Sequence, residues 1–206
     1  MRSCRFYLLP VCFLLMLTLR SEGKTKKTEL KVGDKAPVFE GFNDQNKKWI
    51  SKKYASKKIY VVYFYPADMT PGCTKQACGY RDALAEMDRK DVEVIGISGD
   101  TVENHQHFKR EYKLNFTLLS DTDGKIAEAF GVPTDKGGEI ERKISGEMIK
   151  LKRGRTAKRW TFVIDKQWKI VYKDTAVKAA KDSTKVLEVI KRLTSPSGSL
   201  PLAPSS

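Results

Sequence analysis

Histidine and cysteine are scarce in this chain of 206 residues, which has two of the first and four of the second. His105 and His107 lie two positions apart on a predicted helix, so their side chains diverge and should occupy an exposed face. This spacing argues against a shared metal site, and we expect no bound metal. No acidic or amide residue accompanies the histidines in a recognisable arrangement, which argues against a cysteine–histidine hydrolase. A glycine-rich phosphate-binding loop is also missing.

The chain also lacks a hydrophobic run long enough to be a clear transmembrane helix. The apolar stretch at residues 6–19 is shorter than the roughly 20 residues that span a bilayer, and Pro10 interrupts it. Arginines precede this stretch and small residues follow it, a pattern typical of a cleaved secretory signal peptide. We therefore expect residues 1–23 to be a signal peptide and the protein to be exported, either secreted or periplasmic. Without cleavage, the segment would associate the protein with a membrane.

The cysteines are divided between this leader and the rest of the chain. Cys4 and Cys12 lie inside residues 1–23, which leaves Cys73 and Cys78 as the thiols of the mature chain. A disulfide between positions five apart encloses almost no chain, so it would constrain the unfolded state little and would be a poor structural brace. The pair therefore indicates a redox role.

Acidic residues are outnumbered, with 25 Asp and Glu against 39 Lys and Arg and a formal net charge of +14. Without residues 1–23 the balance is 36 basic and 24 acidic residues, or +12. Such a charge attracts anionic surfaces non-specifically and gives no reason to expect a specific nucleic acid partner. A basic module that binds an anionic surface is one hypothesis for the function. A solubilising coat of charge explains the composition equally well.

Strand-like and helix-like patterns alternate along residues 32–193, between a lysine-rich linker at 24–31 and a Ser/Pro-rich tail at 194–206 that we expect to be disordered. The predicted strands are 59–65, 92–98, 117–119, 160–164 and 168–172, and the predicted helical segments are 73–87, 102–112, 126–130 and 182–193. This order predicts one α/β domain of the thioredoxin-like fold, with a central mixed sheet flanked by helices. Asp182 or Ser183 is the expected cap of the last helix.

The segment after the first strand carries the chemistry. It places Cys73 at the N-terminus of a helix, where unpaired backbone N–H groups and the helix dipole stabilise a thiolate, the nucleophilic form of the side chain. Pro66 pre-sets the loop before the helix, and the Thr70 hydroxyl lies three residues before the sulfur. Together they could shape a small pocket in which a peroxide oxygen meets the thiolate. Attack on the O–O bond would give a sulfenic acid.

Pro66, Thr70 and Cys73 match the Pro-x-x-x-Thr-x-x-Cys signature of the peroxiredoxins, and the chain resembles that family over about residues 32–193. The run Thr-Pro-Gly-Cys-Thr-x-Gln-Ala-Cys is similar to the bacterioferritin comigratory protein, or peroxiredoxin Q, subgroup, and Cys78 matches the resolving cysteine of that subgroup. The resemblance implies the peroxiredoxin fold and a thiol peroxidase that reduces hydrogen peroxide and organic hydroperoxides without a cofactor. It also implies a thioredoxin-like reductant, although export departs from many intracellular relatives.

The resemblance further implies a remote arginine just before the penultimate pair of strands. Arg159 stands there, and it would stabilise the thiolate and hydrogen-bond the peroxide oxygens. Residues 136–159 look like a loop longer than usual for the subgroup, with nine basic and three acidic residues, so Arg153 or Arg155 could compete for this role. Gln76, in the same helical turn as the reactive cysteine, either orients the pocket or is a solvated polar residue.

Helix geometry sets a condition on the disulfide. Positions five apart in an intact helix are separated by about 7.5 Å of rise, whereas a disulfide needs Cα atoms roughly 4.4–6.8 Å apart. Bonding of Cys73 to Cys78 therefore requires the start of the helix to unwind, which Gly79 would make less costly. Since both thiols lie in one chain, we expect a monomer. An exported dithiol–disulfide oxidoreductase is a weaker hypothesis, because such proteins use Cys-x-x-Cys.

Overall fold

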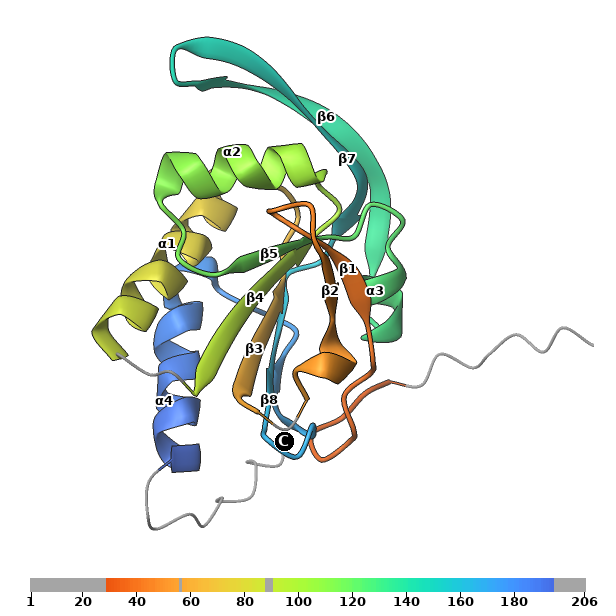
Figure 1. Cartoon of the computed structure of the whole chain (residues 1–206), viewed down its shortest axis with the longest axis vertical. Coiled ribbons are helices and arrows are strands. Elements are labelled where there is room, and N and C mark those ends of the chain that lie inside the picture. The colour runs from red at the N-terminus through yellow and green to blue at the C-terminus, as the bar shows by residue number, and fades with distance from the viewer. Residues whose placement is uncertain (1–28, 56, 88–90, 195–206) are drawn as a thin grey trace, which may run out of the picture.

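The computed structural model describes residues 29–55, 57–87 and 91–194 (Figure 1). The predicted signal peptide, residues 24–28 of the predicted linker and the tail from residue 195 lie outside the described residues. Within the described ranges, no helix combines the length and the apolar character needed to cross a membrane.

A seven-stranded mixed sheet forms the centre of the domain, in the order β2-β1-β5-β4-β3-β8-β9. Its strands are β1 (Glu40–Asn43), β2 (Lys48–Ile50), β3 (Ile59–Phe64), β4 (Val92–Ser98), β5 (Thr117–Ser120), β8 (Trp160–Ile164) and β9 (Ile170–Asp174). The pairs β3–β4 and β4–β5 are parallel, whereas β8 pairs antiparallel with both β3 and β9. The predicted mixed sheet is therefore confirmed. The sequence did not predict β1 and β2, which are short, and β9 begins two residues later than expected.

Helices cover both faces of the sheet. They are α1 (Pro71–Met87), α2 (Val102–Tyr112), α3 (Lys125–Ala129) and α4 (Asp182–Thr194), with short 3₁₀ helices η1 (Ser51–Lys53) and η2 (Ala179–Lys181). Because side chains alternate along a strand, those of β3 enter two different cores. Tyr63 packs in the core shared with α1, α2 and α4, and Phe64 packs in the core shared with α3 and β8. All six residues of β3 are buried, as the continuous apolar run predicts.

Residues 136–159 are not a loop, so that prediction is wrong. Strands β6 (Thr134–Ile144) and β7 (Glu147–Ala157) form a two-stranded ribbon that extends beyond the sheet (Figure 1). The turn between them has positive φ at both Ser145 and Gly146, the geometry of a tight hairpin turn. Ile144 and Leu151 are buried in the core of α1 and α2, while most of the exposed positions are charged. The many charges hid the strand periodicity, because no continuous apolar run marks either strand.

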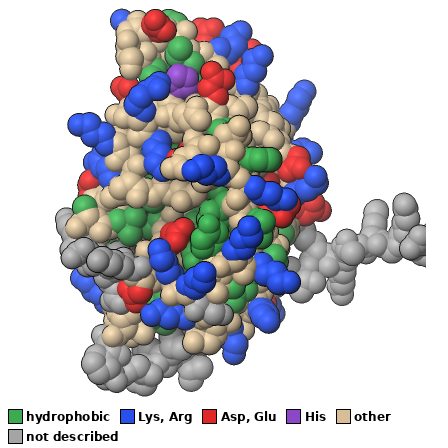
Figure 2. All heavy atoms as spheres, viewed as in Figure 1, with side chains coloured by type: hydrophobic (Ala, Val, Ile, Leu, Met, Phe, Trp, Pro, Cys, Tyr) green, Lys and Arg blue, Asp and Glu red, His purple; other side chains and the backbone are tan. Residues whose placement is uncertain are grey.

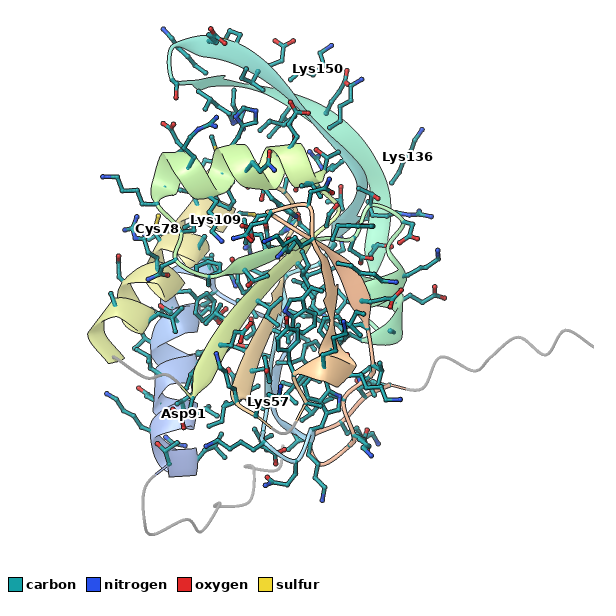
Figure 3. The ribbon with its side chains drawn as sticks, viewed as in Figure 1. Lys57, Cys78, Asp91, Lys109, Lys136 and Lys150 are labelled. Atoms are coloured by element: carbon teal, nitrogen blue, oxygen red, sulfur yellow. The ribbon has the colours of Figure 1, made fainter. Side chains whose placement is uncertain are left out.

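The charges of the ribbon are partly paired across its strands. Glu139 lies opposite Lys152 and Glu141 lies opposite Lys150, which are favourable cross-strand pairs. Lys136 and Lys150 project away from the sheet (Figure 3). Lysine and arginine side chains are spread over the visible face of the molecule and do not gather into one patch (Figure 2).

Candidate active site

The loop between β3 and α1 positions the candidate nucleophile. Cys73 is the third residue of α1, after Pro71 at the first helical position, and its side chain is 1% exposed. The first helical hydrogen bond runs from the backbone N–H of Thr74 to the Thr70 carbonyl, at 2.8 Å. The Thr70 hydroxyl donates to the Ala67 carbonyl at 3.0 Å, which leaves its oxygen lone pairs available as acceptors.

Arg159, the residue immediately before β8, reaches the sulfur of Cys73. Its Nη2 atom lies 3.2 Å from the Cys73 Sγ, and its Nη1 atom donates to the Gln76 side-chain oxygen. Arg153 instead donates to the Thr156 hydroxyl, and Arg155 packs over Gly124. Of the three candidate arginines, all of which lie in the described part of the chain, only Arg159 therefore contacts Cys73.

Gln76 is fully buried, so its interpretation as a solvated residue is wrong. Its Nε2 atom donates to the Asp182 Oδ2 at 2.6 Å, and the same oxygen accepts from the Tyr80 hydroxyl at 2.7 Å and the Thr161 hydroxyl at 2.8 Å. Burial raises the pKa of Asp182, and these three hydrogen bonds oppose the shift. The sequence indicated only a helix cap here, because an Asp at the start of a helix normally has that role.

His105 is buried, so the prediction that it lies on an exposed face is wrong. It shares a face of α2 with the buried Phe108, three residues on, and its Nδ1 atom lies 2.7 Å from the Asp68 Oδ2. Asp68 is thus an acidic partner that the sequence did not reveal. Burial lowers the pKa of His105, but the charges of Asp68 and Asp100 outweigh this effect and leave the pKa raised.

This buried pair anchors the loop that leads to the cysteine. The Tyr65 hydroxyl donates to the Asp68 Oδ1 at 2.7 Å, and the Asp68 backbone N–H donates to the Asp100 Oδ2 at 2.9 Å. Burial, followed by the charge of Asp68, raises the pKa of Asp100 to about 6. Asp68 is therefore fixed to α2 and to Asp100 just before that helix. The Tyr65 backbone N–H donates to the Ile97 carbonyl of β4, although Pro66 itself is only partly buried.

The ribbon also contacts this loop. Arg142 of β6 donates from Nε to the Met69 carbonyl at 3.1 Å, one residue before Thr70. Met69 has a φ of 59°, a backbone conformation that is uncommon outside glycine. No sequence pattern pointed to Arg142, because it was one of many charges in the supposed loop.

Cys78 lies on the same helix as Cys73, partly buried, and both thiols are free (Figure 3). Burial raises the pKa of Cys78, which keeps it in the thiol form at neutral pH. Because α1 is continuous through both positions, the two sulfurs cannot bond in this conformation. In the described part of the chain, no three His, Cys, Asp or Glu side chains are grouped as metal ligands.

The fold and the site together indicate the class of protein to which this chain belongs. A buried cysteine at a helix N-terminus, on a thioredoxin-like sheet and in contact with an arginine, is the arrangement expected of a thiol peroxidase. The AhpC/TSA family matches residues 32–173. The chain therefore belongs to the AhpC/TSA family, whose members are peroxiredoxins, and its relatives place it in the bacterioferritin comigratory protein and peroxiredoxin Q subgroup.

Individual relatives agree with this assignment. A Coxiella burnetii protein named as a peroxiredoxin is 41% identical over 138 residues, which are 67% of this chain and 83% of that protein. Chloroplastic peroxiredoxin Q of Arabidopsis thaliana is 50% identical over 108 residues, and this chain spans half of its length. The solved structure of peroxidoxin BcpB from Mycobacterium tuberculosis superposes with a TM-score of 0.66 at 30% identity, covering 81% of this chain and 100% of that one.

Proposed function

We propose that this peroxiredoxin reduces hydroperoxides at Cys73 and then forms an intramolecular disulfide with Cys78. The observation that carries the proposal is the 3.2 Å contact between Arg159 Nη2 and the Cys73 Sγ at the start of α1. A guanidinium and the positive end of a helix both favour a thiolate over a thiol. This combination supports a nucleophilic role for the sulfur.

In the first step, the Cys73 thiolate attacks one oxygen of the peroxide. A sulfur–oxygen bond forms and the O–O bond breaks, so the sulfur is oxidised to a sulfenic acid. The other oxygen leaves with the electron pair as hydroxide or alkoxide and takes a proton from solvent. Arg159 is placed to stabilise the charge that develops on the oxygens, and Thr70 offers a hydroxyl beside them. Pro66 shapes the loop.

In the second step, the Cys78 sulfur attacks the sulfenic acid, the disulfide forms and water leaves. The residues between the two cysteines must unwind first, because the intact helix separates the sulfurs. Gly79 contributes in two ways: it lowers the cost of unwinding, and it allows close packing on α4, where an added Cβ would lie 2.8 Å from the Ser183 hydroxyl. Unwinding therefore also loosens the contact between α1 and α4.

A thioredoxin-like dithiol then reduces the disulfide and completes the cycle. We also propose that the protein acts as a monomer, since one chain carries both thiols, and that it is exported, on the pattern of residues 1–23. The positive charge supports non-specific contact with anionic surfaces as an additional property. On the face seen in Figure 2, lysine and arginine are spread and do not gather into one patch.

Peroxide consumption with dithiothreitol as the reductant tests the proposed activity. The wild-type protein should consume hydrogen peroxide and an organic hydroperoxide, and Cys73→Ser should consume neither. Replacing dithiothreitol with thioredoxin and its reductase tests the reductant separately. Equal peroxide consumption by the wild-type and Cys73→Ser proteins would contradict the proposed function.

A further inference from the structure

Asp182 connects α4 to the elements that build the site. Its side chain is 1% exposed, and its Oδ2 accepts hydrogen bonds from Gln76 and Tyr80 of α1 and from Thr161 of β8. Its Oδ1 is also buried and makes no hydrogen bond with the described residues. Burying a carboxylate is costly, and placing it against three donors compensates for part of that cost.

The carboxylate determines which end of the Gln76 amide faces the arginine. A carboxylate can only accept, so the Nε2 of Gln76 must point toward Asp182. The amide oxygen then points the other way, where it accepts from Nη1 of Arg159. The second guanidinium nitrogen of Arg159 faces the Cys73 sulfur. A continuous chain of contacts thus runs from α4 to the reacting atom.

The same contacts hold the segment that must unwind. Gln76 lies between Cys73 and Cys78, and Tyr80 lies two residues after Cys78. Disulfide formation therefore breaks the Gln76 contact with Asp182 and loosens the Tyr80 contact, since both depend on the helical form of α1. In the proposed mechanism, peroxide reduction uses the helix with these contacts intact, whereas disulfide formation requires that they break.

We propose that Asp182 is a positioning residue that orients Arg159 through Gln76 and, by holding α1 folded, sets the balance between peroxide reduction and disulfide formation. This inference rests on the proposed function of the two cysteines. Asp182 touches neither the sulfur nor the peroxide. It acts on the first step by aligning the arginine and on the second step by opposing the unwinding of the helix.

Rapid-quench mass spectrometry on the full mature chain measures both steps, because it separates thiol, sulfenic acid and disulfide forms. In Asp182→Asn, the second-order rate constant for oxidation should fall about tenfold, the effect of losing one charge-assisted hydrogen bond. The first-order rate constant for disulfide formation should rise. Glu188→Gln, which removes an exposed carboxylate from the same helix, is the matched control and should change neither.

A double-mutant cycle tests whether Asp182 acts through Gln76. In a Gln76→Ala background, Asp182→Asn should cause no further loss of oxidation rate. Tyr80→Phe removes one contact with Asp182 but keeps the ring stacked on Tyr63, so it should speed disulfide formation even if Asp182→Asn does not fold. A Tyr80→Phe protein with an unchanged resolution rate would contradict the effect on unwinding.

The outcomes separate this inference from the proposed function. If the wild-type chain shows neither oxidation nor disulfide formation, the proposed function fails and the inference fails with it. If the wild type reacts and Asp182→Asn lowers only the midpoint of thermal unfolding, with both rate constants unchanged, then Asp182 is a structural residue and the inference alone is overturned.

Discussion

Arg159 and Cys73 are 86 positions apart in the chain, yet the Arg159 Nη2 lies 3.2 Å from the Cys73 Sγ. The contact forms because β8 pairs antiparallel with β3, which brings the residue before β8 to the end of β3 where the cysteine loop begins. The topology of the sheet thus places a fixed cation at the N-terminus of α1.

Arg159→Lys should lower the second-order rate constant for hydrogen peroxide by at least about tenfold. Lysine keeps the charge but has one nitrogen in place of the planar fork, so it cannot place one nitrogen on the sulfur and another on Gln76. Competition kinetics against a peroxidase of known rate would measure the loss. Arg155→Lys, at the exposed arginine over Gly124, is the matched control and should react at the wild-type rate.

Thr70→Val should reduce peroxide turnover by about tenfold or more, because it removes the hydroxyl that can bond a peroxide oxygen. Thr70→Ser keeps the hydroxyl and should retain most of the rate. The same steady-state assay with dithiothreitol compares the two. A Thr70→Val protein that turns over peroxide at the wild-type rate, or a Thr70→Ser protein that loses as much as Thr70→Val, would contradict a role specific to the hydroxyl.

The buried pair of His105 and Asp68 should be visible in a titration. His105 should titrate above its ordinary pKa of 6.5, because the neighbouring carboxylates outweigh burial. Proton NMR of the two histidines, with His107→Gln to assign them, measures this directly. Asp68→Asn should lower the His105 pKa, and a His105 that titrates below 6.5 in the wild type would refute the charged pair.

The same pair predicts how stability depends on pH. Since the folded-state pKa of His105 is raised, its contribution is fully present below pH 6.5, the unfolded value, and is lost as the pH rises through the folded-state pKa. Denaturant midpoints measured across this window should therefore fall with rising pH. His105→Leu should remove the part of this pH dependence of the denaturant midpoint that His105 contributes.

The ribbon should contribute to stability through its inner face. Leu151→Ala, at a residue 1% exposed, should lower the free energy of unfolding by about 2–5 kcal/mol. Met148→Ala near the turn, at a residue 64% exposed, should change it by less than about 0.5 kcal/mol. Chemical denaturation of both variants measures the difference, and equal small effects would mean that the ribbon does not pack on the core.

Local patterns were enough to predict the parts of the fold that depend on neighbouring residues. The bounds of β4, α2 and β8 agree with the sequence, because the two strands are rich in β-branched and aromatic residues and Thr101 caps α2. The position of Cys73 near the start of a helix follows from Pro71, Gly72 and the helix formers after them, although α1 begins at Pro71, two residues earlier than expected. The ribbon was missed because its buried positions are separated by charges.

Residues that act through distant contacts could not be found in the same way. Gln76 and Asp182 are 106 positions apart, and Asp68 and His105 are 37 apart, so no local spacing connects either pair. His105 was expected on an exposed face because it lies two positions from His107, and only the packing of that helix on the cysteine loop shows that it is buried. Sequence alone pointed to Arg159 through the family resemblance, not through any property of the segment around it.

Intact mass spectrometry of the mature chain after one equivalent of hydrogen peroxide tests the central claim most directly. The wild type should lose two hydrogen atoms as the disulfide forms, Cys73→Ser should stay unchanged, and Cys78→Ser should hold a sulfenic acid that a trapping reagent captures. A wild-type chain whose thiols both remain reduced, or a Cys73→Ser protein that still gains oxygen at Cys78, would contradict the assignment of the two cysteines.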